Sequence, residues 1–272
     1  MAISGSNNFD QLPRFDKAVN ANPGAPRALC FGDSWFQYPF QAVDLNKQLA
    51  RHFKRTLFLN QSVAGRDSAS WKIGLPQVQR AIADYRFDAI LLSGGGNDVV
   101  GDELTEFLKT PDQPQSLGST DWGWLPPVVR DYVRLETFEH ALRYAMKDLG
   151  QVVQCRDLFS AQSIVYVHTY DYIYPDGRGF KGKLKGPWVR PALLAVGLTD
   201  AAEQRNLTNW LLQQFRRVLR EFVSQHRNLR LVDSLDVLKS KAQWDNEIHP
   251  TPAGFRALAE QAWVPALTGV LR

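Results

Sequence analysis

The feature that most constrains the fold is a repeated alternation of short apolar segments with longer segments of helical periodicity. The apolar segments are continuously hydrophobic, as expected for parallel strands covered on both faces. Such alternation predicts a parallel sheet between two layers of helices, because right-handed crossovers carry each helix across the sheet. The expected strands are 27–31, 57–59, 89–92, 163–168 and 229–232, and the expected helices are 41–55, 71–85, 134–158, 201–225 and 252–267.

Length and composition favour one domain. The chain has 272 residues, of which 44% are hydrophobic and 22% charged, and no Pro-, Ser- or Gly-rich linker divides it. We therefore expect an irregular N-terminal segment, 1–26, followed by a single domain, 27–272. Insertions are expected at about 99–133 and 170–200, where the chain is too long and irregular for simple loops.

Charge and cysteine content exclude several classes of protein. The net charge is +4, but the Lys and Arg residues form no single stripe, so no nucleic-acid partner is expected. Cys30 and Cys155 imply no disulfide framework and are expected in the core. No segment has the length of a transmembrane helix, and the N-terminus lacks the apolar region of a secretory signal. We expect a cytoplasmic protein, although secretion without a cleaved signal would leave the same sequence.

Three loops rich in Gly, Ser, Asn and Asp follow three of the expected strands, at 32–35, 60–68 and 94–98. Ligand sites in open α/β sheets lie outside the carboxyl ends of the strands. Because these ends share one edge of a parallel sheet, the three loops are expected to converge in space.

Ser34, in the first of these loops, is a candidate nucleophile. Serine is also common as a helix cap in such turns, so the residue alone decides little. His249 stands just before the last expected helix, and a serine hydroxyl becomes a nucleophile when an imidazole can take its proton. Acyl transfer also needs donors for a developing oxyanion, which the Gly65 backbone and the Asn97 side-chain amide can supply.

The order and spacing of these residues resemble the motif blocks of the GDSL, or SGNH, hydrolase superfamily. The resemblance covers roughly 27–254 and rests on Phe31-Gly32-Asp33-Ser34, Gly65, Gly95-Gly96-Asn97-Asp98 and His249. It implies a flavodoxin-like three-layer α/β/α fold and a serine-dependent esterase, lipase, thioesterase or carbohydrate deacetylase activity, with no metal and no cofactor.

The resemblance also implies roles for individual residues. Ser34 would be the nucleophile and His249 the general base. The Ser34 backbone, the Gly65 backbone and the Asn97 side chain would form the oxyanion hole.

One position departs from the family pattern. Members usually carry Asp three residues before the histidine, whereas this chain has Asn246, flanked by Asp245 and Glu247. An amide oxygen can accept from Nδ1–H, but it cannot stabilise an imidazolium by charge. Three arrangements are therefore open: a Ser-His-Asn triad, a dyad aided by a carbonyl group, and a carboxylate shifted to Asp245 or Glu247. Asn246 ranks first by position.

The two insertions supply candidate substrate-binding residues. Aromatic side chains stack on sugars or cover acyl chains, and lysines attract carboxylate or phosphate groups. The expected substrate is therefore a lipid, carbohydrate or other small-molecule ester, with an anionic part. The alternative is a lysine-solvated loop whose aromatic groups pack onto the domain. The candidates are Trp35, beside the nucleophile, and Trp122, Trp124, Tyr172 and Lys183.

The favoured interpretation is hydrolysis of a carboxylic ester through an acyl-enzyme on Ser34, the ester being an O-acetyl group on a carbohydrate or a lipid ester. Two others stay open: a carbohydrate- or lipid-binding module that has lost efficient catalysis through Asn246, and an acyltransferase that excludes water. His168 and Asp171 are either a second site or, as is more common for a lone histidine, part of the packed interior.

Overall fold

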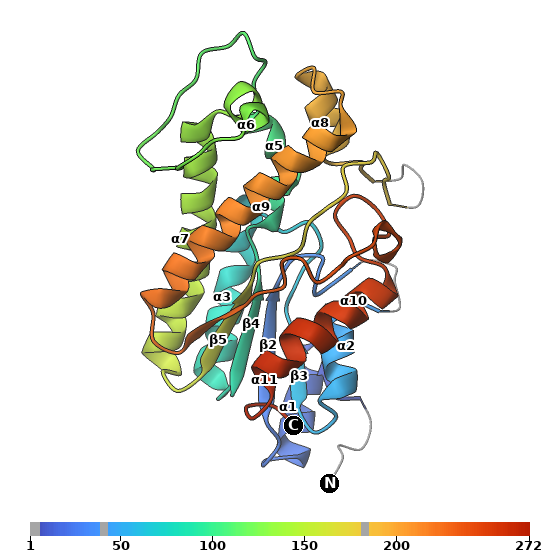
Figure 1. Cartoon of the computed structure of the whole chain (residues 1–272). Coiled ribbons are helices and arrows are strands. Elements are labelled where there is room, and N and C mark those ends of the chain that lie inside the picture. The colour runs from blue at the N-terminus through green and yellow to red at the C-terminus, as the bar shows by residue number, and fades with distance from the viewer. Residues whose placement is uncertain (1–5, 39–42, 181–184) are drawn as a thin grey trace.

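The computed structural model describes residues 6–38, 43–180 and 185–272 and shows a parallel sheet at the centre of the molecule (Figure 1). The strand order is β1-β3-β2-β4-β5-β6, and every pair of neighbours is parallel. The predicted α/β/α fold is confirmed, with six strands rather than five. The strands are β1 Asn8–Phe9, β2 Arg27–Gly32, β3 Leu57–Asn60, β4 Ala89–Ser93, β5 Ile164–His168 and β6 Leu229–Val232.

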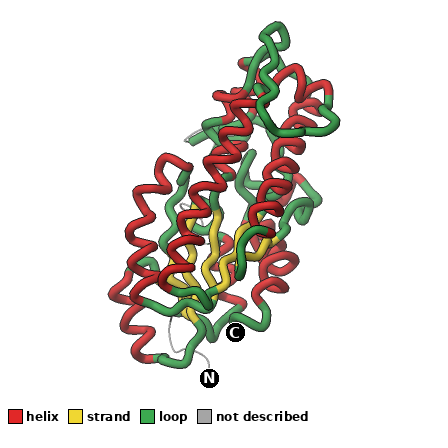
Figure 2. Tube along the Cα trace, turned by 90° about the vertical axis from the view of Figure 1, so that its left-hand side faces the viewer, coloured by secondary structure: helices red, strands yellow, loops and turns green. Residues whose placement is uncertain are grey.

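Helices cover both faces of the sheet (Figure 2). One layer holds α3 Ser68–Asp84, α7 Leu135–Phe159 and α9 Ala201–Ser224, and the other holds α2 Leu45–His52, α10 Pro252–Leu258 and α11 Val264–Leu267. A π-helical turn, Ala259–Trp263, joins α10 to α11, so the last expected helix is nearly continuous. No helix in the described ranges is long and apolar enough to cross a membrane. Cys30 and Cys155 are buried and unbridged.

The expectation of an irregular N-terminal segment is wrong for much of that segment. Strand β1 pairs with β3, and helix α1 spans Leu12–Ala21. Phe15 and Val19 lie one helical turn apart and are both buried, and the Phe15 ring contacts Phe9 and Phe87. These few apolar side chains attach the segment to the sheet in spite of its polar composition.

Strands β2, β4 and β5 bring the carboxyl-end loops together. Gly32 pairs with Ser93 at the end of β4, and its φ is +155°. A β-carbon on Gly32 would lie 2.0 Å from the Ser93 carbonyl oxygen, so only glycine lets the two strands end this close to each other. Ser34 follows directly and lies at the carboxyl edge of the sheet.

Both insertions lie beyond the carboxyl ends of the strands, above the sheet in Figure 1. The first contains α5 Leu104–Phe107 and α6 Pro127–Tyr132, and a bridge between Leu108 and Val133 closes it. The second contains α8 Arg190–Ala195. Between β4 and α5, the short helix α4 Gly96–Val100 carries Asn97.

A buried arginine holds the opposite, amino-end edge of the sheet together. Arg156, near the end of α7, is fully buried. Its guanidinium donates to the carbonyl oxygens of Ser163, Arg227 and Asn228, each at 2.8 Å. These carbonyls precede β5 and β6, so one side chain ties α7 to two strands.

We expect Arg156→Met to lower the free energy of unfolding by roughly 3 kcal/mol or more, because three hydrogen bonds from a charged group are lost and such bonds contribute about 1.5–3 kcal/mol each. Urea denaturation measures the change. Arg80→Met, at an exposed position of α3, is the control and should shift stability by less than about 0.5 kcal/mol. Equal effects of the two substitutions would show that the Arg156 hydrogen bonds contribute nothing to stability.

Candidate active site

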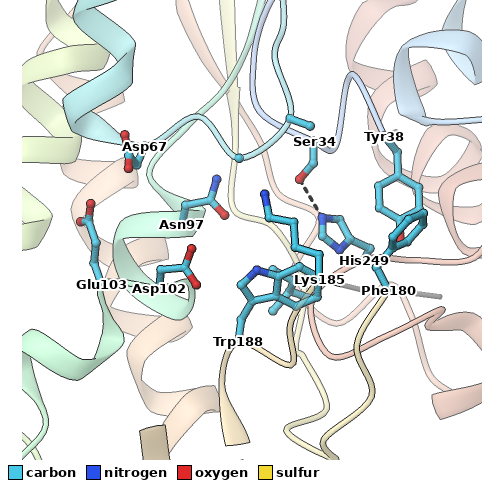
Figure 3. A pocket seen from close by; sticks show the side chains of 13 residues that line it. Ser34, Tyr38, Asp67, Asn97, Asp102, Glu103, Phe180, Lys185, Trp188 and His249 are labelled. Carbon is cyan, nitrogen blue, oxygen red and sulfur yellow. Dashed lines mark hydrogen bonds between the residues drawn. The ribbon is translucent and has the colours of Figure 1, made fainter. Parts of the chain in front are cut away.

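Ser34 and His249 meet at the carboxyl edge of the sheet (Figure 3). The Ser34 Oγ lies 2.7 Å from Nε2 of His249, although the two residues are 215 positions apart. Nδ1 of the same ring lies 2.9 Å from Oδ1 of Asn246. Ser34 and His249 are each 5% exposed, and Asn246 is fully buried.

The hydrogen bonds of Asn246 determine which nitrogen of the imidazole carries its proton. Asn246 Oδ1 also accepts from the backbone N–H groups of Ile248 at 3.2 Å and His249 at 3.0 Å. An amide nitrogen could not accept these bonds, so the oxygen must face the ring. Nδ1 therefore donates to Asn246, and Nε2 is left to accept the Ser34 proton.

The two neighbouring acids do not take the place of the missing aspartate. Asp245 Oδ2 accepts from the Tyr38 hydroxyl at 2.8 Å and lies 3.4 Å from the Asn246 amide nitrogen, and Tyr38 accepts from the same amide at 2.8 Å. The Asp245 backbone N–H donates to the His249 carbonyl at 2.8 Å, but the Asp245 carboxylate is linked to Nδ1 of the ring only through the Asn246 amide. The prediction of Asp245 as a catalytic residue in contact with the ring is wrong, because its carboxylate accepts a hydrogen bond from the Tyr38 hydroxyl instead.

Glu247 is fully buried and points away from the site into the second insertion. Oε1 accepts from the backbone N–H groups of Gly177 at 2.9 Å and Arg190 at 3.0 Å. Oε2 accepts from those of Trp188 at 2.7 Å and Val189 at 2.8 Å. The carboxylate therefore anchors the second insertion beside His249. Because both of its oxygens bind backbone N–H groups there, Glu247 does not replace the missing aspartate as the partner of His249.

Burial keeps His249 neutral. Burial, with a smaller contribution from the positive charge of Lys185, lowers the pKa of the ring to about 3. The Tyr38 ring lies 4.4 Å from the imidazole, between centroids, and covers one face. A neutral imidazole is the form that can accept a proton from serine.

Three donors surround the pocket next to Ser34. Gly65 has a φ of +76°, a conformation that favours glycine. Neither the Ser34 nor the Gly65 backbone N–H donates to another group in residues 6–38, 43–180 or 185–272. Asn97 Nδ2 donates one hydrogen to the Arg66 carbonyl at 2.8 Å, which leaves its second N–H for a ligand.

A buried network supports the nucleophile turn from below. Asp33 Oδ1 accepts from the Trp35 backbone at 2.9 Å and from Ser93 Oγ at 2.7 Å, and Oδ2 accepts from the Tyr170 hydroxyl. Burial raises the pKa of Asp33 to about 6 in spite of these donors. His168 Nε2 lies 2.9 Å from Ser93 Oγ, and burial lowers its pKa to about 3.

His168 therefore belongs to the interior beneath the site. Asp171 is buried too, and its carboxylate accepts from the backbone N–H groups of Tyr172, Asp236 and Leu238 at 2.6 to 2.7 Å. Neither residue forms a second site.

Two hollows adjoin the Ser34–His249 pair. The larger encloses about 80 Å³, with Lys185 and Trp188 of the second insertion on one side. On the other side are Asp67, Asp102 and Glu103 (Figure 3), and burial raises the pKa of Glu103 to about 8. The smaller encloses about 20 Å³, and its apolar wall contains Trp35, Val100, Ile173 and Ile248.

The structure places the expected substrate-binding residues in different parts of the molecule. Trp35 is buried, donates from Nε1 to the Ile248 carbonyl at 3.2 Å and lines the smaller hollow. Trp122 packs on the Phe138 ring, and Trp124 is 79% exposed and lines a separate groove. The Tyr172 hydroxyl accepts a hydrogen bond from the Gln213 side chain. Lys183 lies outside the described residues.

Trp122, Trp124 and Tyr172 are therefore corrected: none of them lines either hollow at Ser34. The reason for the tryptophans is that their part of the first insertion folds toward α7 and α9, and Tyr172 instead faces Gln213 of α9. Tyr38, Lys185 and Trp188 line the larger hollow and were not among the predicted site residues. Lys185 and Trp188 lie in the second insertion, whose lysines and aromatic groups were the sequence signal, whereas Tyr38 is marked only by its place four positions after Ser34.

We expect Glu247→Gln to destabilise the protein by about 2 kcal/mol or more, because the new amide nitrogen cannot accept from two of the four N–H groups and hydrogen bonds to a charged group contribute about 1.5–3 kcal/mol each. Urea denaturation gives the value. Glu260→Gln, at an exposed position, provides the matched control. A Glu247→Gln variant as stable as the control would contradict the anchoring role.

The pKa of about 3 for His249, against an ordinary value of 6.5, predicts a ring that stays neutral as the pH falls from about 8 to about 5. The sign follows from burial, which disfavours the charged form. Proton NMR of the His249 ring, assigned by its loss in His249→Gln, should show no titration in this range. A midpoint at 6.5 or above would contradict the prediction.

The profile of the GDSL-like Lipase/Acylhydrolase family matches residues 30–257. The sequence has no match among functionally curated proteins. Similar solved structures include an extracellular lipase from Streptomyces rimosus (18% identity, TM-score 0.52, covering 88% of this chain and 100% of that chain). Another is the lipase Lip_vut3 from a goat rumen metagenome (13% identity, TM-score 0.51, covering 91% and 99%).

Identities this low show a common fold and nothing finer. The family match covers most of the chain, including all four motif blocks that carried the resemblance. The family match supports ester hydrolysis in general. The chain belongs to the GDSL-like Lipase/Acylhydrolase family.

Proposed function

We propose that the protein is a serine esterase that removes a short acyl group through an acyl-enzyme on Ser34. The observation that carries this proposal is the 2.7 Å contact between Ser34 Oγ and a neutral His249 whose other nitrogen is held by Asn246. Three N–H donors beside the same hydroxyl suit an oxyanion.

The proposed reaction has two stages. His249 takes the Ser34 proton as Oγ bonds to the ester carbonyl carbon, and the carbonyl oxygen becomes an oxyanion held by Ser34, Gly65 and Asn97. The carbon–oxygen bond to the alcohol then breaks, and His249 gives its proton to the departing oxygen. In the second stage His249 takes a proton from water as the water oxygen bonds to the acyl carbon. The bond between that carbon and Ser34 Oγ then breaks, and His249 returns the proton to Oγ, which releases the acid and restores Ser34.

The two hollows suggest which part of the ester lies where. The smaller, of about 20 Å³, has room for roughly one water-sized group, which is the size of the methyl group of an acetyl ester. The larger has a mostly apolar wall that also carries several polar side chains, which suits the apolar faces and hydroxyl groups of an alcohol such as a sugar, with Trp188 able to stack on a ring. Asp67 and Asp102 disfavour a strongly anionic alcohol part there. We therefore favour acetyl esters of neutral, hydroxylated alcohols.

Ser34→Ala should lower the turnover of p-nitrophenyl acetate by roughly 10⁴-fold or more and abolish labelling by a fluorophosphonate probe. Wild type should also prefer acetate to butyrate by at least about 10-fold, because added methylene groups do not fit the smaller hollow. Ser224→Ala, at an exposed position, should change neither property.

Each failure has a distinct meaning. Absence of labelling at Ser34 would favour a non-catalytic binding module. Labelling accompanied by faster transfer to an added alcohol than to water would favour an acyltransferase. Equal turnover of acetate and butyrate would reject the acetyl preference while leaving the esterase intact.

A further inference from the structure

We propose that the ammonium group of Lys185 is a further catalytic group, a fourth donor to the oxyanion that forms when Ser34 attacks the ester. This inference rests on the proposed function. It concerns a residue from the second insertion that lies outside the four motif blocks of the sequence.

The Lys185 side chain reaches the place where the oxyanion would form. Its Nζ lies 3.4 Å from the position that a β-carbon on Gly65 would take, which brings it close to one of the three N–H donors. Figure 3 shows this nitrogen between the Asn97 amide and the Ser34 hydroxyl. The same hollow is lined by all four residues.

The charge of Lys185 is not neutralised by an ion pair. Within the described ranges, no carboxylate lies within 4.0 Å of its Nζ. The acidic side chains of the hollow are on the opposite wall: in Figure 3, Asp67 and Glu103 lie beyond Asn97 and Asp102 lies below it. A positive charge without a close partner is therefore directed at the reacting atoms.

The backbone holds Lys185 in this place from both sides. Its carbonyl oxygen accepts from the Phe180 backbone N–H at 2.7 Å, in a bridge between the two residues. A few residues later, the backbone N–H groups of Trp188 and Val189 bind the buried Glu247 carboxylate. The lysine thus extends from a segment that is fixed to the loop of His249.

Electrostatics decide whether such a cation helps. In the transition state a negative charge develops on the carbonyl oxygen and a positive charge on His249. Lys185 stabilises the first and opposes the second, as its effect on the pKa of His249 shows. Because its nitrogen lies beside Gly65, at the oxyanion position, the attraction exceeds the repulsion. The cation also supplies charge to a site in which Asn246 supplies none.

The test compares Lys185→Met with Lys185→Arg and with the exposed control Lys72→Met, using neutral p-nitrophenyl acetate. Lys185→Met should lower kcat by on the order of 10²-fold, as loss of one oxyanion donor does, with little change in KM. The acid limb of its pH–rate profile should also move to higher pH, because removing the cation raises the pKa of His249. Lys185→Arg should keep most of the activity, and Lys72→Met all of it.

Other results would overturn the inference. Unchanged kcat on the neutral ester, with a raised KM only for esters that carry a carboxylate, would make Lys185 a substrate anchor. Equal losses in the Met and Arg variants, without movement of the acid limb, would make its role structural. Fluorophosphonate labelling and circular dichroism show whether each variant is folded with Ser34 in place. Failure of the proposed function is separate, since wild type itself would then lack turnover that depends on Ser34.

Discussion

The arrangement at the carboxyl edge of the sheet depends on one atom, Oδ1 of Asn246. It accepts from two backbone N–H groups of its own loop and from Nδ1 of His249. The backbone bonds fix the orientation of the amide, and the amide then fixes that of the ring. An aspartate in this position would add a negative charge, whereas asparagine contributes orientation alone.

The residue that follows serves a different part of the molecule. Glu247 faces away from His249 and binds four backbone N–H groups of the second insertion. Two adjacent side chains therefore connect the histidine loop in two directions, one to the imidazole and one to the wall that carries Lys185 and Trp188. The geometry of the larger hollow depends on both connections.

The sequence predicted most of the sheet and the central residues of the site for a physical reason. Continuously apolar strands and amphipathic helices leave regular patterns of hydrophobic residues in the sequence. The site residues are identified by their order and spacing along the chain: Ser34, Gly65, Asn97 and His249. Strand β1 leaves no such signal, because it is only two residues long and gains its order from pairing with β3. The motif residues lie in loops that follow parallel strands. Because the carboxyl ends of these strands share one edge of the sheet, the topology predicts that the loops lie close together.

The roles of the acids and of the insertions could not be read in the same way. Asp245 and Glu247 look alike in sequence, and only the folded positions of Tyr38 beside one and of Gly177 and 188–190 around the other decide their partners. The tryptophans of the first insertion were misplaced because a loop of that length can fold across the site or onto α7, and its composition permits both. Lys183 and Lys185 are likewise indistinguishable without the bridge at Phe180.

The Glu247 contact has one more consequence, which concerns variation between related sequences. The carboxylate binds only backbone N–H groups, so it places no demand on the side chains at those positions, provided that none is proline. Residues facing the ligand can then be exchanged without detaching the segment from the histidine loop. In the proposed esterase, such exchanges would alter selectivity for the alcohol part and leave the contacts among Ser34, His249 and Asn246 unchanged.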